Sequence, residues 1–313
     1  MSRAVGEPFF DKLINGELSI ILEAVHNDTT LNMELRGSEV KIYYRGRLLS
    51  TIKEHDDSRV LCNDAYLKHH ISGNSLNITP SPQYFVGNLA LYKAPIDYYL
   101  ANVKSYLEEQ IKQQLVLENN VYRSSSGKTG DYFIIDTEYA FEDDITIDAR
   151  FDAIALRWPS TISSRRVKKH LGLSFLELKY NDSAKTGDAG IRKHIDDFLT
   201  FVKREEYYDM CKDMEEVFVQ KCKLGLIPAY NQAGSVNNIS IDYEKSDLIF
   251  ILANSDPDSE NMVKEWETIK NKYTESELNN VFIGQASNFG YCLFRYGNQG
   301  EKDMYVRIKD YFD

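Results

Sequence analysis

The chain has 313 residues, of which 42% are apolar and 12% aromatic, enough to bury one large core or two smaller ones. Its formal net charge of −11 by itself disfavours a nucleic-acid partner, because phosphate backbones reward clustered Lys and Arg. No window approaches the roughly 18 consecutive apolar residues of a membrane helix, and the N-terminus does not resemble a secretory signal. We therefore expect a soluble, unprocessed protein with no membrane partner. The four cysteines lie far apart without a C-x-x-C pair, so neither a zinc knuckle nor a disulfide framework is expected, and the predicted compartment is the cytoplasm.

Positive charge is concentrated in one segment of this acidic chain. Residues 150–193 carry ten basic and four acidic side chains, so the window has a net charge of +6 and the rest of the chain −17. Such a segment is either a solvated surface or the place where a polyanion docks.

Residues 1–94 are expected to form a strand-rich N-terminal module. Residues 31–52 alternate apolar and polar side chains around a Gly-Ser turn, and residues 80–88 are expected to form a loop. No residue of this module indicates a chemistry. Recognition of a target, binding of a partner protein and homo-oligomerisation all remain open as its role.

Residues 95–313 are expected to form a second domain, which begins with a helix over residues 96–120, where apolar residues recur at spacings of three and four. The later elements follow from apolar runs, turn residues and helical periodicity. In chain order they are a hairpin of strands 131–142 and 145–158 turning at Asp143 and Asp144, a basic loop 159–172, a strand 173–180, a long helix from Ala189 to Phe218 capped by Asp188, a strand 247–254, a helix 259–272, and strands 281–286 and 291–297. The pattern predicts an α/β (α+β mixed-sheet) domain.

The strand 173–180 carries two charges among apolar residues. Glu177 and Lys179 are two places apart, so they share one face of the strand, and Asp152 likewise interrupts an apolar run on the preceding strand. A buried carboxylate costs several kcal/mol unless it is paired or holds a metal. One interpretation is a salt bridge between Glu177 and Lys179 with a solvated Asp152. The other is a site where carboxylates from adjacent strands bind a hard divalent cation.

The runs "FDAIAL" and "FLELKY", some twenty residues apart, with a helix before the hairpin and another after the third strand, resemble the PD-(D/E)XK nuclease superfamily. The resemblance covers roughly residues 96–255 and implies a restriction-endonuclease-like core of order αβββαβ. Its lone Asp maps onto Asp152, and its Glu-x-Lys maps onto Glu177 and Lys179. The chain departs from the family name in lacking the Pro, since Phe151 precedes Asp152.

The family's additional acidic residue is not uniquely assignable. Glu109 lies off the apolar stripe of the first helix, and Glu118 continues that stripe at the helix end. Glu138, on the strand beside Asp152, is the third option and the one included among the candidate catalytic residues; Asp136 would share its face.

The resemblance implies a Mg²⁺- or Mn²⁺-dependent phosphodiesterase acting on nucleic acid, with DNA preferred over RNA and a role in restriction or defence. Asp152, Glu177 and the backbone carbonyl of Leu178 would bind the metal, and Lys179 would orient or help deprotonate a water. The predicted nucleic-acid contacts come from the basic loop and the start of the following helix: Arg165, Arg166, Lys168, Lys169, Arg192, Lys193 and His194.

Two other classes of protein stay open. The same fold without catalysis would serve as a nucleic-acid-binding or protein-interaction module. If the motif is coincidental, the chain is an acidic interaction protein that neither binds metal through these carboxylates nor cuts DNA.

Overall fold

The chain forms two compact units. Unit 1 comprises Met1–Leu117 and Glu216–Pro228, and unit 2 comprises Glu118–Glu215 and Ala229–Asp313. The computed structural model describes residues 2–56, 59–67, 76–102, 107–120, 130–142, 148–187, 190–227, 236–256, 259–286 and 306–310. The division predicted at residue 94 falls inside unit 1, which also includes a segment from the second half of the sequence.

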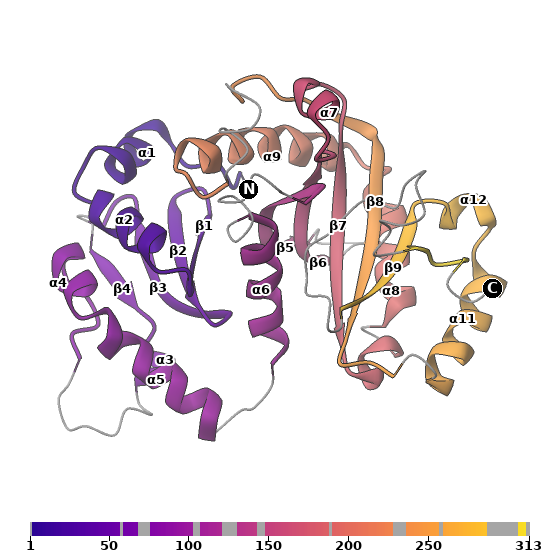
Figure 1. Ribbon diagram of the computed structural model, residues 1–313, viewed down its shortest axis with the longest axis horizontal. Helices are drawn as coiled ribbons and strands as arrows, with labels where there is room; N and C mark the ends of the chain where they lie inside the picture. Colours follow the sequence, from indigo (N-terminus) through magenta and orange to yellow (C-terminus); the bar gives the residue numbers. More distant parts are fainter. Residues whose placement is uncertain are drawn as a thin grey trace. The chain divides into compact units, whose positions relative to one another are not determined.

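Unit 1 is built on an antiparallel sheet with strand order β1-β2-β3-β4 (Figure 1). Helix α2 packs on α1 and β1, and helix α5 contacts β3. Its elements are α1 (Glu7–Ile14), α2 (Ser19–Asn27), β1 (Leu31–Leu35), β2 (Glu39–Tyr44), β3 (Arg47–Lys53), β4 (Val60–Cys62), α3 (Asp64–Leu67), α4 (Pro82–Gly87), α5 (Leu89–Asn102), and the parts of α6 (Glu108–Asn120) and α9 (Glu205–Lys223) that fall within its ranges.

The predicted alternation of residues 31–52 is confirmed as β1 to β3, but two expectations, a loop over residues 80–88 and a helix that starts at Pro95, are wrong. Helices α1 and α2 precede the first strand of the module that was expected to be strand-rich, and residues 80–88 contain α4 instead of a loop. Helix α5 begins at Leu89 and keeps Pro95 in its interior, where a helix start was predicted. Pro95 has no amide hydrogen to donate to the carbonyl of Leu91, a residue that is 46% exposed.

Two contacts join distant segments within unit 1. The Lys221 ammonium lies 2.7 Å from Glu34 Oε2, and both side chains are buried. The Gln220 side chain accepts from Val5 N at 3.0 Å and donates to Val5 O at 2.8 Å. Both partners of each contact belong to unit 1. The contacts therefore attach residues 216–228 to a part of unit 1 that lies almost 200 residues earlier in the sequence.

Unit 2 is built on a six-stranded mixed sheet with order β10-β9-β8-β7-β6-β5. Strands β5, β6 and β7 pair antiparallel, β7, β8 and β9 pair parallel, and β10 is antiparallel to β9. The strands are β5 (Tyr132–Glu142), β6 (Asp148–Arg157), β7 (Leu171–Tyr180), β8 (Ile241–Ala253), β9 (Val281–Ala286) and β10 (Val306–Arg307). The helices are α7 (Ile162–Arg166), the 3₁₀ turn η1 (Asp182–Lys185), α8 (Ile191–Phe201), the first part of α9, α11 (Glu260–Lys272) and α12 (Glu275–Leu278).

Helix α8 packs on the sheet at β6 and β8, and aromatic rings lie between helix and sheet. The Phe175 ring lies 4.5 Å from that of Phe151 and 5.6 Å from that of Phe198, between centroids. Strand β7 is buried from Leu171 to Lys179, so the charged pair that the sequence singled out lies on a central strand. A mixed α/β architecture is thereby confirmed.

The predicted strands agree with β5 to β9, whereas the long helix predicted from Ala189 to Phe218 is two helices. Helix α8 ends at Phe201, where the amides of Lys203 and Arg204 bond to carbonyls three residues back, and α9 begins at Glu205. Residues 159–172 also contain the short helix α7. The predicted hairpin turn at Asp143 and Asp144, the Asp188 cap and the strand 291–297 lie outside the described residues.

Candidate functional site

Strands β6 and β7 bring Asp152 beside Leu178. The antiparallel pairing of these strands extends as far as Ala153 opposite Leu176. Asp152 is one residue beyond this last pair on β6, and the Leu178 amide, two residues beyond it on β7, donates a hydrogen bond of 2.7 Å to Asp152 Oδ2. A side-chain carboxylate thus binds a backbone amide where the strand ladder ends, which fixes the position of Asp152 against the Glu177–Lys179 segment.

Glu177 and Lys179 form an ion pair inside the sheet. Their residues are 3% and 5% exposed, and Glu177 Oε2 lies 3.5 Å from Lys179 Nζ. Their partners on parallel strand β8 are Phe250 and Leu252, which are also buried. Mutual compensation lowers the cost of burying both charges in this apolar surrounding. The salt bridge weighed from the sequence is therefore present, while Asp152 is half-buried and hydrogen-bonded instead of solvated.

His194 of α8 contacts the same carboxylate. Its Nδ1 lies 3.3 Å from Glu177 Oε1, and the imidazole is mostly buried. Glu177 therefore has a nitrogen of Lys179 near one oxygen and a nitrogen of His194 near the other. The sequence placed His194 near the site but assigned it to nucleic-acid binding. Its position at the edge of the apolar stripe of α8 was the sequence signal that its side chain could face the sheet and contact Glu177.

Among the further acidic candidates, Glu138 lies nearest to Asp152 in the sheet. It falls between the pairs Thr137 with Ala153 and Tyr139 with Phe151, level with Asp152 on the neighbouring strand. It is exposed and has φ of 53°, a left-handed conformation that is uncommon for a residue other than Gly. Asp136, which opposes Ile154, is buried.

The two candidates on helix α6 are placed differently. Glu109 belongs to unit 1, where its carboxylate lies 3.5 Å from Lys112. Glu118 belongs to unit 2 and is half-buried near the end of the helix.

Arg165 does not fit its predicted role as a phosphate contact. Only 4% of the residue is exposed, its Nη2 donates to Gly130 O at 2.7 Å, and its guanidinium lies 4.3 Å from the Phe133 ring centroid. Burial lowers the pKa of the Arg165 guanidinium to about 10, so it remains charged at neutral pH. Its contacts attach the loop around α7 to Gly130 and Phe133, while the neighbouring Arg166 and Lys169 are exposed and Lys168 is half-buried.

The basic loop and the charged pair lie at opposite ends of β7. The loop ends where β7 begins at Leu171, and Glu177 is six residues further along, which for an extended strand is roughly 20 Å. The basic loop and the candidate site are therefore separated by most of the length of β7.

The basic residues at the start of α8 are engaged with carboxylates. Arg192 Nε lies 2.6 Å from Glu265 Oε1, and this hydrogen-bonded carboxylate raises the pKa of Arg192. Lys193 pairs with Asp197 one turn along the helix. A phosphate contact by either side chain would compete with these ion pairs.

The oxygen donors suit a hard cation, although they are few. No cluster of three or more His, Cys, Asp or Glu side chains in a metal-binding arrangement occurs in the described part of the chain. Asp152, Glu177 and the Leu178 carbonyl would supply two carboxylates and one backbone oxygen. Mg²⁺ commonly binds through one or two carboxylates and completes its shell with water and substrate phosphate, so this donor set fits Mg²⁺.

Comparison with protein-family models, with curated proteins and with solved structures gives no match. Over the residues that can be described, none of the helices combines the length and the apolar character needed to cross a bilayer.

Proposed function

We propose that the chain is a metal-dependent nuclease of the PD-(D/E)XK type that hydrolyses phosphodiester bonds in DNA. The observation that carries the proposal is the 2.7 Å hydrogen bond from Leu178 N to Asp152 Oδ2, because it places the lone Asp against the Glu-x-Lys segment. The surrounding elements support it: an antiparallel β5-β6-β7 meander is followed by α8 and by β8, which is parallel to β7.

Each residue of the site has a defined task in this proposal. Asp152, Glu177 and the Leu178 carbonyl would hold the cation, which when bound would stabilise negative charge developing on the phosphodiester oxygens. Lys179 Nζ would hold the attacking water by a hydrogen bond and favour its deprotonation. His194 Nδ1, 3.3 Å from Glu177 Oε1, would fix the orientation of that carboxylate.

The ion pair between Glu177 and Lys179 gives the proposal a specific requirement. Each charge is buried and is compensated by the other, so a cation at Glu177 would have to coexist with the Lys179 ammonium. Phosphate groups of the substrate would supply the additional negative charge. We therefore expect metal affinity to rise when nucleic acid is present.

Calorimetric titration with Mg²⁺ and Mn²⁺ tests the metal site directly. Wild type should bind one divalent ion, Asp152→Asn should lose at least about tenfold in affinity, and Asp213→Asn, a control on α9 of the same unit, should behave as wild type. Binding that is identical in all three proteins would refute the assignment of Asp152.

A second function is a binding module without catalysis. It is favoured by the placement of Glu177 between Lys179 and His194, which compensates the carboxylate without a cation. Under this alternative the protein would bind nucleic acid equally with EDTA and with Mg²⁺, and calorimetry would detect no metal.

A further inference from the structure

Two aliphatic side chains point to solvent beside the cations of the α7 loop, which we define as residues 159–170. Ile162 is 78% exposed and Val167 is 56% exposed. Arg166 and Lys169 are exposed next to them, and the α7 loop contains no acidic residue. The exposed aliphatic side chains of the loop are therefore accompanied by basic side chains and by no acidic residue of the loop itself.

Buried side chains of and next to the α7 loop hold the loop in place. The Arg165 guanidinium bonds to Gly130 O and lies over the Phe133 and Trp158 rings, and Trp158 Nε1 donates to Ser164 O at 2.9 Å. These contacts attach α7, through Ser164 and Arg165, to groups in and next to β5 and β6. The exposed side chains are thus presented in a set arrangement, which reduces the ordering cost of binding.

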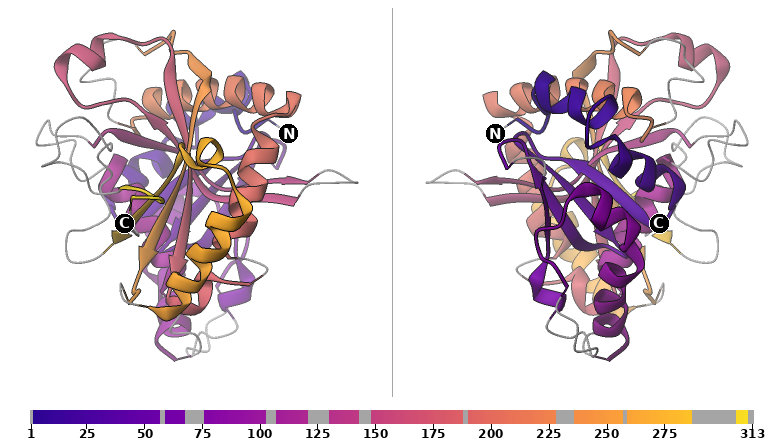
Figure 2. Two further views of the ribbon diagram at one scale, coloured as in Figure 1. Left: turned by 90° about the vertical axis from the view of Figure 1, so that its right-hand side faces the viewer. Right: turned by 90° about the vertical axis from the view of Figure 1, so that its left-hand side faces the viewer.

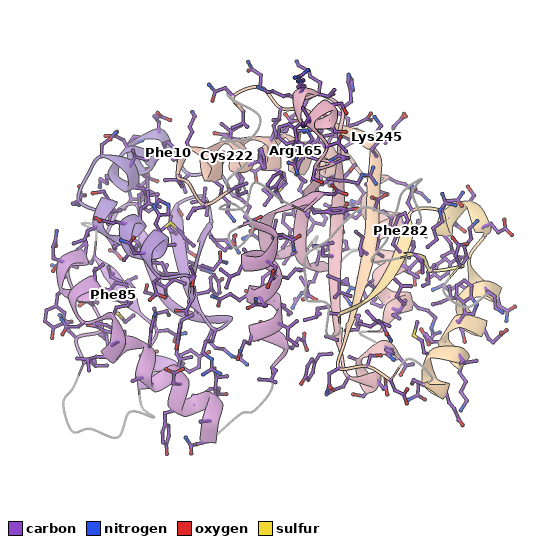
Figure 3. All side chains as sticks on the ribbon, viewed as in Figure 1. Phe10, Phe85, Arg165, Cys222, Lys245 and Phe282 are labelled. Carbon is purple, nitrogen blue, oxygen red and sulfur yellow. The ribbon has the colours of Figure 1, made fainter. Side chains whose placement is uncertain are left out.

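The α7 loop projects beyond the strands at one end of the sheet (Figure 2). Arg165 lies at this end together with Lys245, whose ammonium is 3.3 Å from His170 O (Figure 3). Lys245 also pairs with Asp242 at 3.0 Å. The distance of roughly 20 Å along β7 to Glu177 corresponds to about six base pairs of a duplex.

We infer that the α7 loop is a groove-binding element for double-stranded DNA, an inference that rests on the proposed function only in taking nucleic acid as the partner. Ile162 and Val167 contact base edges or separate a base step, and Arg166 and Lys169 contact the flanking phosphates. Aliphatic wedges among Arg and Lys are typical of minor-groove binding, whereas single strands are held on aromatic stacking platforms. The two large hydrophobic side chains exposed on the described α7 loop are aliphatic.

An anionic membrane surface is the competing partner for a basic and apolar element. Interfacial membrane binding relies on an amphipathic helix that buries a continuous apolar face. Helix α7 spans only Ile162–Arg166, and Ile162 is its one large aliphatic residue. The charge and the small apolar area therefore fit a DNA groove better.

The phosphate contacts proposed for Arg166 and Lys169 are tested by the binding of a fluorescent duplex of about 24 base pairs, measured by anisotropy in EDTA. The Arg166→Gln/Lys169→Gln variant should bind about tenfold or more weakly, and the slope of log K against log salt should fall by about two. The matched control is Lys264→Gln/Lys270→Gln, which removes two partly exposed charges from α11. This control should bind as wild type.

The apolar part is tested by Ile162→Ser beside Val263→Ser, a 53% exposed Val on α11. Ile162→Ser should weaken duplex binding about tenfold with an unchanged salt slope, because the lost contact is apolar. Its affinity for a single strand of the same sequence should be unchanged. Val263→Ser should match wild type on both substrates.

Several results would overturn the inference. Duplex affinity that is equal in wild type and in both α7-loop variants would refute it. An equal loss on single and double strands for Ile162→Ser would refute groove contact, and binding of phosphatidylserine vesicles but not of duplex would assign the α7 loop to a membrane.

Failure of the proposed function would look different, because binding is measured without hydrolysis. If duplex binding depends on the α7 loop but the wild-type protein does not cleave DNA, the nuclease proposal is refuted and this inference is supported. Metal-dependent cutting with duplex binding unaffected by the α7-loop substitutions would do the reverse.

Discussion

The buried ion pair between Lys221 and Glu34 allows a quantitative prediction for unit 1. The two atoms that form the pair, Lys221 Nζ and Glu34 Oε2, are 2.7 Å apart, and the side chains are 2% and 0% exposed. Lys221→Met keeps most of the side-chain volume and removes the charge, so it isolates the electrostatic contribution. Glu34 would then be a buried carboxylate with its nearest cation deleted.

The expected loss follows from what remains around Glu34. Removing one partner of a buried ion pair typically costs about 3–5 kcal/mol. Arg36 Nη1 lies 3.6 Å from Glu34 Oε2, and Asn32 Nδ2 donates to Glu34 Oε1 at 2.9 Å. These contacts compensate part of the charge, so we expect the lower end, about 3 kcal/mol. Lys221→Met/Glu34→Gln should recover more than half of that loss, because the uncompensated charge is gone.

Hydrogen exchange followed by mass spectrometry is the suitable assay, because it reads the amides of unit 1 directly, whereas both Trp residues, Trp158 and Trp266, belong to unit 2. Amides of β1 and β2 should exchange roughly 100-fold faster in Lys221→Met. The control is Lys223→Met, an exposed position two residues along the same helix, with an expected effect below about 0.5 kcal/mol. A loss below about 1 kcal/mol in Lys221→Met would refute the reasoning.

Three further predictions concern thiols, acid stability and the site. Burial raises the pKa of Cys211 to about 12 and also raises that of Cys222, so native protein at pH 8 should leave both unalkylated by iodoacetamide until urea is added, as read by peptide mass spectrometry. Burial would raise the pKa of Asp28, but hydrogen bonds from Lys93 and Thr30 outweigh it and hold that pKa below the ordinary 3.8. The stabilisation is therefore present above pH 3.8 and is lost as the pH falls through the lowered pKa of Asp28. The free energy of unfolding in urea should differ between wild type and Lys93→Met by about 0.5–1 kcal/mol at pH 6, and this difference should vanish at low pH. His194→Ala should weaken Mg²⁺ binding about tenfold in calorimetry without changing the melting temperature by more than a few degrees, and unchanged affinity would contradict its positioning role.

The strands could be predicted because their signals are local. Residues 31–52 alternate and are interrupted by turn residues, and they form β1 to β3. The apolar runs 173–180 and 247–254 form the central parallel strands β7 and β8, whose side chains are buried on both faces. In these segments the two-residue alternation or the continuous apolar run, together with the flanking turn residues, agrees with the strand found in the tertiary structure.

The helix boundaries could not be predicted as well. Val202 continues the apolar periodicity, but α8 ends at Phe201, and the amides of Lys203 and Arg204 that follow bond to carbonyls three residues back. A Pro usually marks the first turn of a helix, yet Pro95 lies inside α5. In both places the local preference does not decide the helix boundary.

Long-range features of the site and of unit 1 left no local signal. The proximity of Asp152 to Leu178 follows from the pairing of two predicted strands, so it could be expected. The burial of Arg165 depends on aromatic rings on two separate segments, and a basic run gives no sign of it. The membership of residues 216–228 in unit 1 likewise depends on contacts across almost the whole sequence.

Cleavage by wild type and by Lys179→Ala tests the central claim most directly. Plasmid, linear and single-stranded DNA and RNA would be incubated with Mg²⁺, Mn²⁺ or EDTA, beside Lys264→Ala, whose side chain is 74% exposed, as the control. The nuclease proposal predicts metal-dependent cutting that survives in Lys264→Ala and falls by at least about 100-fold in a folded Lys179→Ala. Cutting at the wild-type rate by Lys179→Ala, or no cutting by folded wild type on any substrate, would contradict it.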